Sequence, residues 1–61
     1  MTDEIDKMDV LSRFKAELVK STDRHRRALI LGILVHWQTD PDLTERSRRG
    51  AAALLRKFNV S

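Results

Sequence analysis

The chain has 61 residues, contains no cysteine and carries a formal net charge of +3. This length permits one small domain of marginal stability, and the lack of cysteine excludes disulfides and thiolate metal sites. The acidic first ten residues do not resemble a secretory signal, and the apolar run 28–37 is about half the ~20 residues that span a bilayer. We therefore expect one cytoplasmic domain over residues 1–61, with no membrane span, that gains stability by oligomerising.

The first predicted element is an amphipathic helix over residues 3–20. Leu11, Phe14 and Leu18 belong to one apolar stripe, and charged side chains occupy the opposite side. Thr2 is the expected N-cap, because its hydroxyl can accept a hydrogen bond from the first turn.

A second helix is predicted over residues 23–38. Ser21 to Asp23 offers three N-capping residue types in succession, ahead of the apolar run from Ala28 to Trp37. Neither Gly nor Pro interrupts residues 1–31, so one continuous helix through both segments is the alternative.

Large apolar side chains sweep around most of this second helix and leave only a narrow strip, formed by His25, Ala28, Gly32 and His36. A helix that is apolar on most sides needs cover on most sides. So short a chain has few other helices that could cover this surface. We therefore expect a second copy or another protein to cover part of it. The predicted interface residues are Leu29, Ile30, Gly32, Ile33, Leu34, His36 and Trp37.

Thr39 to Asp42 predicts a turn into a third helix over residues 41–58. Asp40 is the expected N-cap, Pro41 the first helical residue, and Asn59 the C-terminal stop. The three segments together predict an all-α, three-helix unit that assembles as a helical-bundle homodimer.

The sequence carries no pattern typical of an enzyme. It has neither a supported Ser–His–Asp or Cys–His arrangement nor a glycine-rich phosphate loop. His25 and His36 are eleven residues apart, about three helical turns, which is too far to share one metal ion within a chain. His36 and Asp40 would form only half of a site. We expect no catalytic residue, no cofactor, no metal and no small-molecule substrate.

Arginine is concentrated in the second part of the chain. From Ser21 onward there are eight bases against four acids, and seven of the bases are arginine. Arginine binds phosphate and carboxylate bidentately, and cations in the first turn of a helix oppose its dipole. A partner that carries negative charge would account for these arginines. The alternative is that they keep the protein soluble and form ion pairs within the chain. The candidate anion or nucleic-acid contacts are Arg24, Arg26, Arg27, Arg46, Arg48, Arg49 and Arg56.

Residues 51–61 resemble the first helix and turn of a helix-turn-helix, as in recombinase and repressor DNA-binding domains. In that family a recognition helix follows the turn, and this sequence ends where that helix would begin. We expect a non-enzymatic interaction or regulatory protein that oligomerises or docks on a protein partner through its central helix. The alternative is a dimeric nucleic-acid-binding regulator that contacts phosphates through the arginines. A peripheral membrane helix is disfavoured, because such a helix needs a broad polar face.

Overall fold

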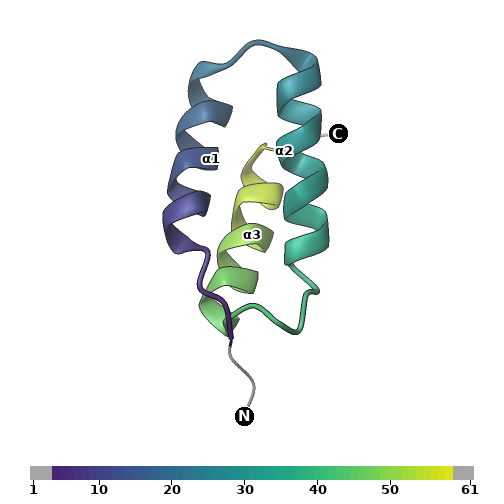
Figure 1. The fold of residues 1–61 in the computed structure, drawn as a ribbon. Coiled ribbons are helices and arrows are strands. Elements are labelled where there is room, and N and C mark those ends of the chain that lie inside the picture. Colours follow the sequence, from purple (N-terminus) through teal and green to yellow (C-terminus); the bar gives the residue numbers. More distant parts are fainter. Residues whose placement is uncertain (1–3, 59–61) are drawn as a thin grey trace.

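The computed structural model describes residues 4–58, which form three helices packed side by side (Figure 1). α1 spans Met8–Lys20, α2 spans Arg24–Trp37 and α3 spans Glu45–Phe58. α1 and α2 lie beside each other in opposite directions, and α3 packs against both (Figure 1). Within these residues the fold is all-helical, which confirms the predicted three-helix class.

The core lies where one side of each helix meets the other two. Its buried members are Leu11, Leu18, Ile30, Leu34, Ala51, Leu54 and Leu55, and Phe14, Leu31, Trp37 and Phe58 pack against them. The rings of Phe14 and Trp37 stack with centroids 5.4 Å apart, which joins α1 to the end of α2. The core therefore takes one side of α2 and leaves the other side outside it.

α1 and α3 both begin later in the sequence than predicted, because the segments before them pair with each other. Ile5 forms an isolated parallel bridge with Leu43, and its N–H donates to the carbonyl of Asp42 at 2.8 Å. Leu43 is buried by this arrangement, with 2% of its surface exposed. Because both segments need extended backbone here, α1 begins only at Met8 and α3 only at Glu45.

The break between α1 and α2 is real, so the continuous-helix alternative is wrong. Ser21 and Asp23 have extended backbone, with ψ values of 135° and 115°. The Asp23 carboxylate accepts from the N–H groups of His25 at 3.0 Å and Arg26 at 3.4 Å. This is the geometry of an N-cap and confirms the predicted start of the second helix.

The cap of α3 differs from the prediction. Thr44 takes that role, because its Oγ1 accepts from the N–H of Ser47 at 3.3 Å. Asp40 instead closes the preceding turn by accepting from the N–H of Asp42 at 2.9 Å. The other two predicted caps, Thr2 and Asn59, lie outside the described residues.

Candidate protein-interaction face

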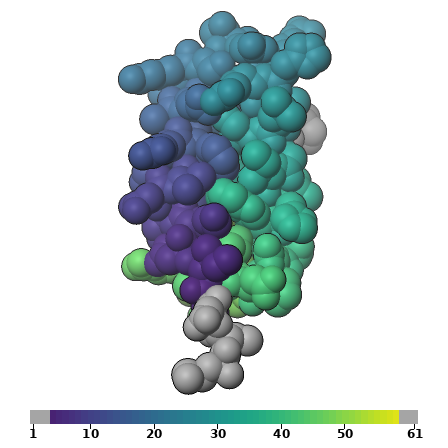
Figure 2. Space-filling view, viewed as in Figure 1, coloured from purple at the N-terminus to yellow at the C-terminus, as the bar shows by residue number. Residues whose placement is uncertain are grey.

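The side of α2 that points away from the core is exposed and largely apolar. Leu29 is 65% exposed, Val35 49% and Ile33 38%. A Cβ atom built on Gly32, which lies among them, would meet nothing within 4 Å. We call this surface the outer face of α2. It consists of His25, Ala28, Leu29, Gly32, Ile33, Val35 and His36. In Figure 2 α2, in teal, forms one long edge of the molecule.

The structure divides the predicted interface residues into two groups. Ile30 and Leu34 are 3% and 0% exposed, and Trp37 packs against the core. These three are covered by α1 and α3 of their own chain, so their assignment to a partner contact needs correcting. The other four, Leu29, Gly32, Ile33 and His36, lie on the outer face of α2.

Three of the candidate arginines form ion pairs within the chain. Arg26 pairs with Glu17 and Arg49 with Glu45, each at 2.8 Å, and Arg46 pairs with Asp6. The Glu17 carboxylate raises the pKa of Arg26 above its ordinary value, chiefly through the hydrogen bond. Such exposed pairs contribute little to stability, and they engage one or two nitrogens of each guanidinium group.

Two further arginines hold backbone carbonyls. Arg27 donates to the carbonyls of Leu18 and Ser21, which closes the C-terminal end of α1. Arg48 donates to the carbonyls of Leu43 at 3.0 Å and Asp40 at 3.4 Å, in the loop before α3.

Arg24 and Arg56 remain, and neither has a hydrogen bond or ion pair to another described residue. At the start of α2, Arg26 and Arg27 therefore have structural roles, whereas Arg24 makes no such contact.

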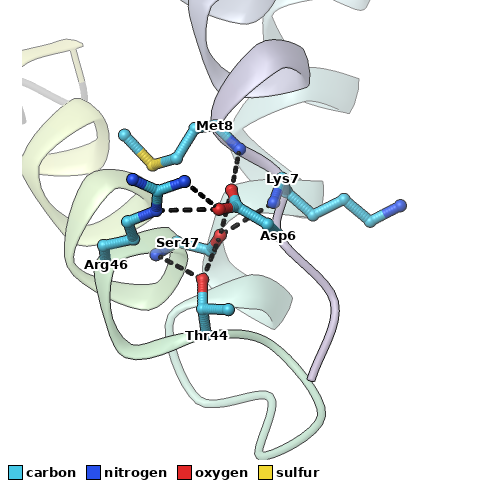
Figure 3. A network of polar contacts seen from close by, with 6 residues as sticks. All are labelled: Asp6, Lys7, Met8, Thr44, Arg46 and Ser47. Carbon is cyan, nitrogen blue, oxygen red and sulfur yellow. Dashed lines mark hydrogen bonds and ion pairs between the residues drawn. The ribbon is translucent and has the colours of Figure 1, made fainter. Parts of the chain in front are cut away.

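A polar network that sequence reasoning missed ties the N-terminal segment to α3 (Figure 3). Ser47 is fully buried and accepts from the N–H of Lys7 and the hydroxyl of Thr44, both at 2.8 Å. Its own hydroxyl lies 3.5 Å from Asp6 Oδ1, and Asp6 also pairs with Arg46. Its members come from opposite ends of the sequence, so no local pattern signals it.

Asp6 makes this attachment depend on pH. The hydrogen bond from the Met8 N–H and, next, that from Arg46 hold the pKa of the Asp6 carboxyl below its ordinary value. The resulting stabilisation is present above the unfolded pKa, about 3.9, and is lost as the pH falls through the lower folded value. We expect Asp6→Asn to lower the melting temperature at pH 7, and the gap from wild type to narrow as the pH falls below about 4.

Circular dichroism melts at a series of pH values measure this gap. Asp9→Asn is the control, because that exposed carboxylate on α1 accepts no hydrogen bond from another described residue. A gap that stays constant down to pH 2 would show that Asp6 does not act through its charge.

The two histidines lie at opposite ends of the outer face of α2. His36 Nε2 is 3.7 Å from Asp40 Oδ2, and the His36 side chain is 76% exposed. Asp40 is free to make this contact because it does not cap α3. No cluster of three or more His, Cys, Asp or Glu side chains suited to a metal ion occurs among residues 4–58 of one chain.

No known protein family, curated protein or solved structure matches this chain. None of the three helices in the described part of the chain is both long and apolar enough to cross a membrane.

Proposed function

We propose that this protein is a non-enzymatic helical interaction module that self-associates through the outer face of α2. The observation that carries the proposal is the exposure of Leu29 and Ile33 around an open Gly32. Apolar surface gains about 25 cal/mol for each Å² removed from water, and clustered exposure of this kind typically marks an interface. A glycine between large side chains lets a second helix approach closely.

Charge distribution favours a second copy as the partner. The start of α2 carries Arg24, which has no ion pair to another described residue, and the turn after its end carries Asp40 and Asp42. An antiparallel copy brings each basic end beside an acidic end, and it also aligns the two helix dipoles favourably. A parallel copy would place the basic ends together.

The nucleic-acid alternative has less support. Five of its seven candidate arginines already hold carboxylates or carbonyls of their own chain. Those carboxylates and carbonyls compete with phosphate for the guanidinium donors, and the three carboxylates also offset positive charge. Arg24 and Arg56 alone offer a small basic surface compared with the six to ten phosphate contacts typical of strongly salt-dependent DNA binding.

Leu29→Glu is expected to convert a dimer into a monomer. The change places a charge in the apolar centre of the proposed interface, where it would be desolvated without a partner. Because Leu29 is 65% exposed within its own chain, the helical content should not change. Sedimentation velocity of the untagged protein at tens of micromolar measures the oligomeric state.

Val19→Glu is the matched control, since Val19 is 64% exposed but lies on α1. It should leave the dimer intact. A wild-type protein that sediments as a monomer, or equal disruption by both substitutions, would contradict the proposal.

A further inference from the structure

In an antiparallel pair of α2 helices, the two outer faces overlap completely only in the register that is centred on their middle. In this register Leu29 of one copy lies level with the partner's Gly32, and Ala28 lies level with the partner's Ile33. Ala28 and Gly32 on this face are small, and a Cβ built on Gly32 would meet nothing within 4 Å, so the two backbones can approach closely here.

The same register brings the histidines together across the two copies. His25 and His36 are eleven residues apart on one helix, a separation of about 16 Å along the axis. They are equally far from the middle of the outer face, so His25 of each copy lies level with the partner's His36. Both side chains belong to exposed residues and are free to turn toward a common ion.

Asp40 supplies a third donor at the same place. Its Oδ2 atom is 3.7 Å from His36 Nε2, while its Oδ1 atom accepts from the Asp42 N–H at 2.9 Å. Two donors bound to one tetrahedral Zn²⁺ at about 2.0–2.2 Å are roughly 3.4 Å apart. The His36–Asp40 pair is therefore already close to the spacing of two zinc ligands.

We propose that the dimer holds two equivalent Zn²⁺ sites, each built from His36 and Asp40 of one copy and the partner's His25. The inference rests on the proposed self-association. Two imidazoles and a carboxylate suit zinc, and water completes the tetrahedron. The carboxylates of Asp40 and Asp42 offset the positive N-terminal end of the neighbouring α2. Because the complete site exists only in the dimer, Zn²⁺ should tighten association by linkage.

Calorimetric titration of the untagged protein with ZnCl₂, together with Co²⁺ absorption spectra, measures the site directly. We expect one ion per chain and a dimer dissociation constant at least tenfold lower with Zn²⁺ than with a chelator. His25→Ala and His36→Ala should each abolish this binding while leaving the circular dichroism spectrum unchanged.

Mixing the two variants tests whether the site is shared between copies. A heterodimer retains His36 on one chain and His25 on the other, so one of its two sites is complete. Random pairing should restore about one ion per four chains, although neither variant binds alone.

Different outcomes would contradict the zinc site and the self-association on which it rests. A wild-type dimer that binds no zinc, a His25→Ala variant that still binds, or a mixture that recovers nothing would overturn the shared site alone. A protein that is monomeric with and without Zn²⁺ would overturn both.

Discussion

Leu34→Ala is expected to lower the free energy of unfolding by about 2–5 kcal/mol, the range for truncating a large buried side chain. Leu34 has 0% of its surface exposed and lies in the core where α2 meets α1 and α3. Small domains have a total stability of about 5–15 kcal/mol, often near the lower end for so short a chain. Urea unfolding followed by circular dichroism should therefore find a much lower transition midpoint for this variant.

Leu29→Ala is the control for this loss, because Leu29 lies on the outer face of the same helix and is 65% exposed. At concentrations where the protein is monomeric, we expect a change below about 1 kcal/mol, since most of the surface of Leu29 is already exposed. Similar losses for both variants would mean that the core does not use the Ile30–Leu34 side of α2.

Ser47→Ala is expected to cost about 1–3 kcal/mol, because it leaves buried hydrogen-bonding groups without a partner. The Lys7 N–H and the Thr44 hydroxyl both donate to Ser47 Oγ at 2.8 Å, and Ser47 is fully buried (Figure 3). The loss should appear in urea unfolding and in faster hydrogen exchange of the Ile5 and Lys7 amides.

Ser12→Ala is the matched substitution, because Ser12 is exposed on α1 and has no side-chain hydrogen bond to another described residue. Its unfolding free energy should match that of wild type within about 0.5 kcal/mol. If Ser47→Ala behaves the same way, the network in Figure 3 does not hold the N-terminal segment.

Local signals predicted the helices well where the responsible residues are neighbours in sequence. Asp23 caps α2 as expected, and Leu11 and Leu18 of the predicted stripe are both buried. The predicted starts of α1 and α3 were wrong. The observed starts depend on the pairing of Ile5 with Leu43, which no local pattern encodes.

The local sequence also did not predict which side of α2 is buried in the core. Ile30 and Leu34 differ little in chemistry from Leu29 and Ile33, so hydrophobicity alone does not decide which pair faces inward. The positions of α1 and α3 decide it. The excess of apolar residues in α2 was enough to predict that some apolar surface is left uncovered. Only the tertiary structure shows which residues lie on that surface.

We expect two copies to meet through the outer face of α2. Isotope-filtered NOE spectroscopy on a mixture of ¹³C-labelled and unlabelled chains can detect this interface, because only contacts between copies give signals. We expect cross-peaks from the Leu29 methyl groups to the partner's Gly32 Hα, the pair that the antiparallel register places level. Intermolecular signals from Val19 and α1 instead, or none from Leu29 and Ile33 at concentrations where the protein is dimeric, would contradict the account.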